Sequence, residues 1–283
     1  MTFLRCGTFK LSLARPLIMG VVNVTPDSFS DGGKFIELNH TLVHARGLID
    51  DGADILDIGG ESTRPGAAPV GLDEERRRIL PVIEALAGGT IPLSVDTQKP
   101  ELMRDAVAAG ASMVNDISGL RYEAELADVV ARRGAAIVLM HTRGRSRDMY
   151  QQASYGDVVS EVLDELRESM AFATGAGVAK DRILVDPGLG FAKEAPHSFE
   201  ALARLDEFSE LGRPIVVGPS RKSFLARALG ARVAASERDW ATAAAVTAAV
   251  LAGAHIVRVH AVEEMLHVTR VADEIRRYHR VDS

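Results

Sequence analysis

Residues 19–33 read MGVVNVTPDSFSDGG, and this stretch sets the interpretation of the whole chain. It begins within an apolar run, 17–22, whose composition is typical of a strand buried on both faces. It then passes directly into a polar loop with an amide, two carboxylates, a proline and an aromatic ring. Such groups suit a loop that holds a metal, closes over an anion and covers a flat ring. Ordinary βα loops use the same residue types, so the stretch alone leaves both interpretations open.

The same pattern, a short Val, Ile or Leu run followed by a segment of helical periodicity, recurs along the chain. The eight runs are 17–22, 55–59, 92–95, 112–117, 136–140, 183–185, 214–217 and 255–259. The helices expected after them are 38–51, 73–87, 100–109, 124–133, 157–175, 198–210, 223–229 with 237–253, and 263–278. Glycines follow five of these helices, where C-caps are expected.

Eight β/α units in one chain of 283 residues predict an α/β fold, a (β/α)8 TIM barrel. We expect a single domain over residues 1–283, with a short N-terminal β-hairpin at 3–13 closing its floor. A doubly wound open sheet is the alternative fold. It is disfavoured because no G-x-G-x-x-G follows any of the eight runs.

Composition narrows the class of protein. A formal net charge of −6 without a clustered basic stretch argues against nucleic-acid binding. The lone cysteine, Cys6, excludes a disulfide within the chain and fits the cytoplasm, and residues 1–16 lack the apolar core of a signal peptide. The alanine-rich stretch 240–254 is too short to span a bilayer, so we expect no membrane association and interpret it as a buried or interface helix.

Mostly polar residues stand at the C-terminal ends of the predicted strands, where barrel enzymes carry their active sites. In strand order they are Asn23; Asp57 and 61–66; Asp96 and Thr97; Asn115 and Asp116; His141 and Arg143; Asp186 and Phe191; 220–223; and Arg258 and His260. Neighbouring Asp and Asn side chains suit a heterocycle with several N–H donors in one plane. Arginine and lysine suit a phosphate or diphosphate, and an amide oxygen with loop carboxylates suits Mg²⁺.

Several of these residues also have a purely structural interpretation. For Asp57 we favour a role in holding neighbouring loops together. Asp96 and Asp186 could cap helices, and His141 could be a buried structural histidine. The charged run 74–78, EERRR, is expected on a solvated helix face, and the histidines show no paired spacing for zinc.

Eight motifs occur in order at successive strand ends: MGVVNVTPDSFSDGG, DIGGESTRPG, SVDT, VNDISG, VLMH, VDPGLGFAK, GPSRKSFL and IVRVH. Together they make most of the chain similar to the dihydropteroate synthase family of folate biosynthesis. The resemblance implies condensation of 6-hydroxymethyl-7,8-dihydropterin diphosphate with 4-aminobenzoate to 7,8-dihydropteroate, with release of diphosphate by a dissociative, SN1-like mechanism. It further implies Mg²⁺, sulfonamides that compete with 4-aminobenzoate, and a homodimer built on late helices such as 240–254.

The resemblance also assigns roles to residues of this chain. Asn23 would bind the metal. The residues implied for the pterin diphosphate are Thr63, Asp96, Asn115, Asp186, Lys222, Arg258 and His260, of which Asp96, Asp186, Lys222 and Arg258 would be catalytic. The residues implied for 4-aminobenzoate are Phe29, Arg64, Pro65, Phe191 and Ser223. The loops 24–33 and 62–69 would close over both substrates.

The departures from the family pattern are small. Ala261 follows His260 where many relatives would have an aspartate, and Thr142 occupies a variable place. Three other functions stay open: a pterin-dependent methyltransferase domain, a non-catalytic pterin-binding paralogue, and a sugar-phosphate barrel enzyme. The last would lack an Asp and Asn floor for a pterin.

Overall fold

The structure, a computed structural model, describes residues 2–24, 34–61, 69–121, 125–144, 148–230 and 233–279. Its main sheet has eight parallel strands in the order β8-β7-β6-β5-β4-β3-β10-β9. They are β3 (Leu17–Asn23), β4 (Ile55–Gly59), β5 (Leu93–Asp96), β6 (Met113–Asp116), β7 (Ala136–Met140), β8 (Ile183–Asp186), β9 (Val216–Val217) and β10 (Ile256–Val259). A parallel bridge between Val185 and Ile215 joins the two outer strands. The predicted barrel is therefore confirmed, and the open-sheet alternative is wrong.

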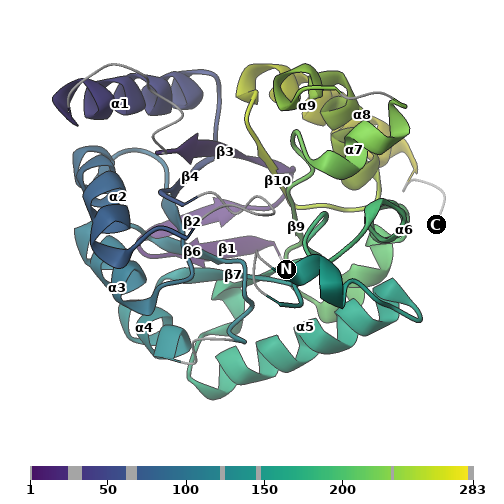
Figure 1. Cartoon of the computed structure of the whole chain (residues 1–283), viewed down its shortest axis with the longest axis horizontal. Helices are drawn as coiled ribbons and strands as arrows, with labels where there is room; N and C mark the ends of the chain where they lie inside the picture. Colours follow the sequence, from purple (N-terminus) through teal and green to yellow (C-terminus); the bar gives the residue numbers. More distant parts are fainter. Residues whose placement is uncertain are drawn as a thin grey trace.

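Helices surround the strands in chain order (Figure 1). They are α1 (Lys34–Asp50), α2 (Leu72–Leu86), α3 (Pro100–Ala109), α4 (Glu125–Arg133), α5 (Val158–Gly175), α6 (Ala195–Ala203), α7 (Ser223–Ala228), α8 (Asp239–Leu251) and α9 (Val262–His279). Short 3-10 turns are η2 (Met149–Gln152), η3 (Lys180–Arg182), η4 (Leu205–Leu211) and η5 (Ala235–Glu237). In the described part of the chain, no helix is both long and apolar enough to cross a membrane.

Two predicted helices were wrong in their extent. The helix expected from residue 38 begins earlier, at Lys34. The segment expected as a single helix over 198–210 is two elements, α6 and η4, which meet at Arg204. Helix α6 begins earlier than predicted, at Ala195, with Pro196 in its first turn. Proline fits there because its fixed φ angle is helical and the first-turn N–H groups have no partner within the helix.

The N-terminal hairpin forms as predicted, from β1 (Phe3–Cys6) and β2 (Phe9–Ser12). Leu4 and Cys6 are fully buried in an apolar cluster with inward-facing strand residues such as Met19 and Ile55. The hairpin therefore plugs one end of the barrel. Burial raises the pKa of the Cys6 thiol to about 12, which keeps it protonated and leaves it a packing role.

Side-chain alternation along the strands divides the interior. Leu56 and Ile58 pack outward against the helices, while Ile55 points inward to the plug cluster. Both faces of each strand are thus covered, which explains the uninterrupted apolar runs. Because side chains alternate along a strand, the next inward position is two residues further on. Four polar residues occupy that position after an inward apolar residue: Asp57, Asn115, Asp186 and Arg258. The interior is apolar near the hairpin and polar at the C-terminal ends of the strands.

Candidate active site

A cluster of hydrogen-bonded polar side chains lies at the polar end of the barrel. Arg258 donates from Nε to Asp57 Oδ2 at 2.6 Å and from Nη2 to Asp96 Oδ2 at 2.8 Å. Asn115 donates from Nδ2 to the same Asp57 oxygen at 3.0 Å. Four strands, β4, β5, β6 and β10, contribute one residue each, so barrel closure assembles the cluster.

Two carboxylate oxygens in this cluster are buried without a donor. They are Oδ1 of Asp57 and Oδ1 of Asp96, neither of which has a hydrogen-bond partner in the described part of the protein. Burial raises the pKa of Asp96 to about 7, although the Arg258 cation acts in the opposite direction. A buried acceptor without a donor costs free energy, which a ligand that supplies N–H groups can recover.

Asp186 and Lys222 form the adjoining part of the mouth. Asp186 Oδ1 accepts from the backbone N–H of Gly188 at 2.7 Å, and burial raises the pKa of this carboxyl group. Lys222 Nζ donates to the Leu189 carbonyl at 2.5 Å and lies 4.3 Å from the centre of the Phe191 ring. Burial lowers the pKa of Lys222 to about 8, with the charge of Asp186 opposing that shift.

The contact from Lys222 connects two loops of the barrel mouth. Phe191 is half-buried in the loop after β8, and Ser223 is the exposed first residue of α7. The ring, the ammonium group and the helix start together provide an apolar wall beside a positive charge. This combination suits an aromatic carboxylate.

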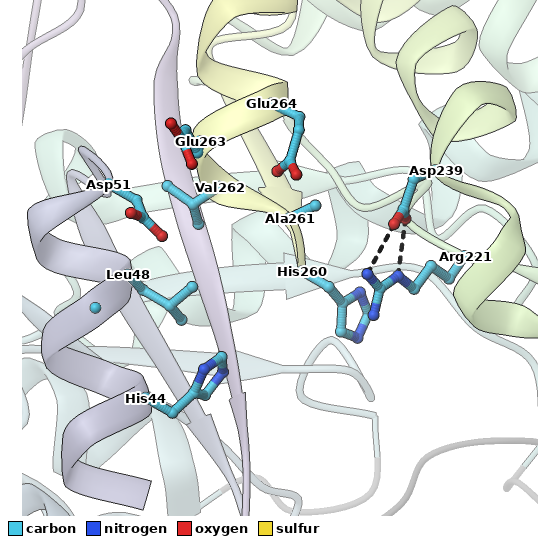
Figure 2. A pocket seen from close by; sticks show the side chains of 11 residues that line it. His44, Leu48, Asp51, Arg221, Asp239, His260, Ala261, Val262, Glu263 and Glu264 are labelled. Atoms are coloured by element: carbon cyan, nitrogen blue, oxygen red, sulfur yellow. Dashed lines mark hydrogen bonds and ion pairs between the residues drawn. The ribbon is translucent and has the colours of Figure 1, made fainter.

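His260 lies at the end of β10 beside a pocket of about 310 Å³. Its backbone N–H donates to Ser220 Oγ at 3.2 Å, and its Nδ1 lies 2.9 Å from the same hydroxyl. Figure 2 shows α1, with His44 and Leu48, on one side of this pocket and the Arg221–Asp239 pair on the other.

Arg221 follows a strand end, where the sequence suggested a cation for a phosphate or diphosphate, but its guanidinium is paired with a carboxylate. Its guanidinium makes two hydrogen bonds of 2.8 Å to the carboxylate of Asp239 (Figure 2). Its backbone φ of +59° lies in the left-handed region, which is strained for a side chain of this kind. Arg221 therefore stabilises the turn that presents Lys222.

Asn23 is the last residue of β3 and its side chain is exposed at the rim. The strand register places it opposite Gly59, which in turn is opposite Asp96, so these residues lie in one row across the strands. The described residues contain no group of three or more His, Cys, Asp or Glu that could hold a metal. A single amide oxygen at the rim fits Mg²⁺, which takes few protein ligands and keeps several waters or substrate oxygens.

Four predicted site residues lie outside the described residues. They are Phe29, Thr63, Arg64 and Pro65. The predicted closing loops 24–33 and 62–69 also fall there, apart from Val24 and Pro69. Their roles stay predictions.

Three structural interpretations from the sequence need correction. Asp57 contacts Arg258 and Asn115 inside the barrel, so it does not merely hold loops together. Neither Asp96 nor Asp186 caps a helix, since α3 follows Lys99 and Asp186 accepts from a loop N–H. Within the run 74–78, Glu75 is fully buried and paired with Lys99 at 2.5 Å, so this run is not uniformly solvated.

Sequence reasoning also missed a buried pair behind the mouth. Lys193 Nζ lies 2.7 Å from His141 Nδ1 and donates to the Phe191 carbonyl at 3.2 Å, while His141 Nε2 lies 2.9 Å from Glu165. Burial lowers the pKa of His141 to about 3 and that of Lys193 well below its usual range. A neutral His141 with both ring nitrogens engaged agrees with its structural interpretation.

Different signals were available for the missed residues. Asp57 follows inward-facing Ile55 by two positions, as Asn115 follows Met113 and Asp186 follows Leu184, so strand parity identifies it. Glu165 lies in the middle of α5, and nothing in its local sequence marks it.

The fold and the site define a class of barrel enzyme whose mouth suits a heterocycle rich in N–H donors beside an anion. Comparisons with known proteins agree. The sequence model of a family described as "Pterin binding enzyme" matches residues 19–260. A dihydropteroate synthase from Synechocystis sp. is 45% identical over 264 residues, which are 93% of this chain and 91% of that protein.

Solved structures give the same result. The dihydropteroate synthase of Xanthomonas albilineans with 4-aminobenzoic acid has a TM-score of 0.90 at 44% identity, covering 97% of this chain and 98% of that one. The enzyme from the same organism in complex with 7,8-dihydropteroate has a TM-score of 0.87 at 42% identity, covering 97% and 98%. The chain therefore belongs to the dihydropteroate synthase family of pterin-binding enzymes.

Proposed function

We propose that this chain joins 4-aminobenzoate to 6-hydroxymethyl-7,8-dihydropterin diphosphate and releases diphosphate and 7,8-dihydropteroate. One observation carries the proposal most directly. The mouth holds a buried carboxylate oxygen without a donor among the described residues, on Asp96, near the cations of Arg258 and Lys222. A dihydropterin diphosphate offers the complement, a ring edge with several N–H donors and an anionic tail.

The pterin would be held by the polar groups of the barrel mouth. Asp96 and Asp186 are carboxylates that can accept from ring N–H and amino groups, and Asn115 adds an amide acceptor. Lys222 would donate to a ring oxygen or nitrogen. Accepting from the ring N–H groups increases the electron density of the heterocycle, which stabilises positive charge on its methylene carbon.

In the reaction, the bond between the methylene carbon and the diphosphate oxygen breaks, and the electron pair leaves with diphosphate. The amino nitrogen of 4-aminobenzoate then forms the new bond to that carbon and loses a proton. Arg258, His260 and Thr63 would neutralise the departing anion. No covalent bond to the protein is needed, which agrees with a mouth built from binding groups rather than an activated nucleophile.

Mg²⁺ bound at Asn23 would supply positive charge on the diphosphate and so make it a better leaving group. Asn23 fits this role because it is a rim oxygen donor in register with the row that leads to Asp96. The remaining ligands would be diphosphate oxygens and water.

The second substrate would lie against the Phe191 ring, with its carboxylate near Ser223 at the start of α7. Phe29, Arg64 and Pro65 would complete this slot from the two loops. The bound 4-aminobenzoic acid in the similar Xanthomonas albilineans enzyme supports this assignment of substrate class.

The proposal includes a cytoplasmic homodimer and one catalytic domain over residues 1–283. Support for the dimer comes from exposed apolar side chains of the last two helices, including Trp240 on α8 and Val271 and Tyr278 on α9. Trp240 is 90% exposed, which is unusual for so large an apolar side chain.

The decisive experiment is turnover of the pterin diphosphate with the purified chain. Diphosphate release is measured with and without 4-aminobenzoate, and with and without Mg²⁺, and the organic product is identified by mass spectrometry. We expect dihydropteroate only when both additions are present. Binding of the pterin without any product would instead indicate a non-catalytic paralogue, and methyl transfer from a methyl-folate would indicate the methyltransferase alternative.

A further inference from the structure

Asp57 lies at the same inward level as Asn115 and Arg258, each two residues past the apolar cluster around the hairpin. On the intervening strand β5, Ser94 pairs with Asp57 and Asp96 pairs with Asn115. The Asp57 side chain is completely buried. It contacts Asn115 and Arg258, two of the residues assigned to the substrate.

From this position Asp57 controls the orientation of Asn115. Asn115 turns its amino group toward the Asp57 carboxylate, with Nδ2 donating to Oδ2 at 3.0 Å. The opposite amide orientation would place two oxygens at this distance and is repulsive. With its amino group directed at Asp57, the Asn115 side chain offers its carbonyl oxygen as the acceptor for a ligand.

Asp57 also fixes the guanidinium plane of Arg258. The same Oδ2 accepts from Arg258 Nε, while Nη2 of that arginine reaches Asp96. The planar guanidinium group is thus held by carboxylates from two neighbouring strands, which leaves it little freedom to rotate. The arginine is therefore oriented before any substrate binds.

We propose that Asp57 is a positioning residue that sets the donor and acceptor selectivity of the pterin site. It makes position 115 an acceptor, so that this part of the mouth selects a heterocycle edge with an N–H donor, and it aligns Arg258. This inference rests on the proposed function. It goes beyond that function because it explains why an asparagine, whose amide has both a donor and an acceptor end, can recognise its ligand in one orientation only.

An exchange of the two side chains tests the inference. Asp57→Asn removes the charge and lets the Asn115 amide turn either way. Asn115→Asp places two carboxylates face to face. In the double variant, the new amide at position 57 can donate to the new carboxylate at position 115 and accept from Arg258 with its oxygen. The carboxylate at 115 then keeps an acceptor for the ligand, and the total charge is that of the wild type.

The measurement is the affinity for 6-hydroxymethyl-7,8-dihydropterin, without its diphosphate, by titration calorimetry, together with the melting temperature of each protein. We expect each single variant to bind at least about tenfold more weakly, the loss of one charge-assisted contact. The double variant should recover to within about threefold of wild type. The matched control is Ser94→Ala, which changes a fully buried polar side chain beside Asp57 and should leave the affinity unchanged.

Three outcomes overturn the inference: no recovery in the double variant, wild-type affinity in Asp57→Asn with only a lower melting temperature, or an equal loss in Ser94→Ala. If Asp57→Asn alone does not fold, Asn115→Asp and the double variant answer the same question, because they differ only at position 57. A wild-type chain that does not bind the dihydropterin refutes the proposed function itself, and this inference with it. Binding by the wild type without recovery refutes only the role of Asp57.

Discussion

At the scale of single residues, the site is built from ionisable side chains whose pKa values are shifted from their ordinary values. Burial raises the pKa of Asp96 and Asp186 and lowers that of Lys222. These shifts record the cost of removing charges from water before a substrate is present. A bound pterin with N–H donors and a polar oxygen would offset part of that cost, which links the electrostatics of the mouth to its choice of ligand.

Removal of one charged contact should impair turnover without unfolding the chain. We expect Lys222→Ala and Asp186→Asn each to lower turnover by roughly tenfold or more, on the scale of one charge-assisted hydrogen bond. Steady-state rates with both substrates are the measurement, with circular dichroism to verify folding. Lys180→Ala changes an exposed lysine before β8 and should leave the rate unchanged. Near-wild-type turnover in both site variants would contradict the site assignment.

The pH dependence follows from two opposite shifts. Asp96 becomes an acceptor as pH rises through its pKa of about 7, and Lys222 loses its charge as pH rises through its pKa of about 8. If both charged forms bind the pterin, kcat/KM for the diphosphate substrate rises through about 7 and falls above about 8. Asp96→Asn should abolish the rising limb. A flat profile in the wild type between about pH 6 and 9 would rule out these two groups as the controlling pair.

At the scale of elements, side chains from three other parts of the chain contact the backbone of the loop after β8. Its carbonyl groups accept from Lys222 at Leu189, from Tyr150 at Gly190 and from Tyr155 at Ala192. Ala192 has a φ of +46°, a left-handed conformation that is strained for a residue with a Cβ atom. So many contacts hold the loop that it keeps this conformation, and the Phe191 ring is placed with it.

Gly188 in this loop should not tolerate a side chain. A Cβ atom there would lie 2.0 Å from the carbonyl oxygen of His141, in addition to the strain of φ +69°. Gly212 has a similar φ of +61°, but a Cβ atom there would meet no described atom within 4 Å, so Gly212→Ala isolates the backbone strain. That strain is about 1 to 2 kcal/mol. We expect Gly188→Ala to lower the melting temperature well beyond this control and to abolish turnover. Equal stability of the two variants would contradict the close approach.

The slot between this loop and α7 should bind 4-aminobenzoate and its sulfonamide analogues in the same place. We expect competitive inhibition by a sulfonamide against 4-aminobenzoate, because both offer an aromatic ring for Phe191 and a polar group for Ser223. Initial rates over a matrix of both concentrations distinguish the modes. Purely non-competitive inhibition would refute the assignment of this slot.

At the scale of the whole molecule, closure of the barrel is what creates the site. Asp57 and Arg258 are 201 positions apart in the sequence, yet their side chains form a 2.6 Å hydrogen bond. The hairpin of β1 and β2 fills the other end of the barrel with Leu4 and Cys6. Polar groups therefore gather at one mouth only, and the apolar half supports them from beneath.

The oligomeric state can be predicted at this scale. We expect the chain to sediment as a dimer, and Trp240→Asp to shift it toward the monomer, because a buried charge would replace an apolar contact. Phe172→Asp is the matched control, since Phe172 is an exposed apolar residue on α5, which lies far from α8 and α9 (Figure 1). A wild-type monomer at micromolar concentration would contradict the proposed interface.

The sequence by itself determined the order and type of the elements and the strand ends that carry chemistry. Apolar runs buried on both faces mark parallel strands, and motifs such as VDPGLGFAK and GPSRKSFL mark the polar ends. The segment 198–210 was an exception, because helical periodicity does not distinguish one helix from an α-helix followed by a 3-10 turn.

Only the tertiary structure decided which side chains meet. Local sequence does not encode that Asn115 and Arg258 share one oxygen of Asp57, or that Lys193 is buried against His141, because these contacts depend on strand register and closure. The tertiary structure also pairs the Arg221 guanidinium with Asp239, so that it does not face an anion site. The physical reason is that period-two alternation fixes the side of a strand on which a residue lies, whereas the neighbours it meets there come from distant strands.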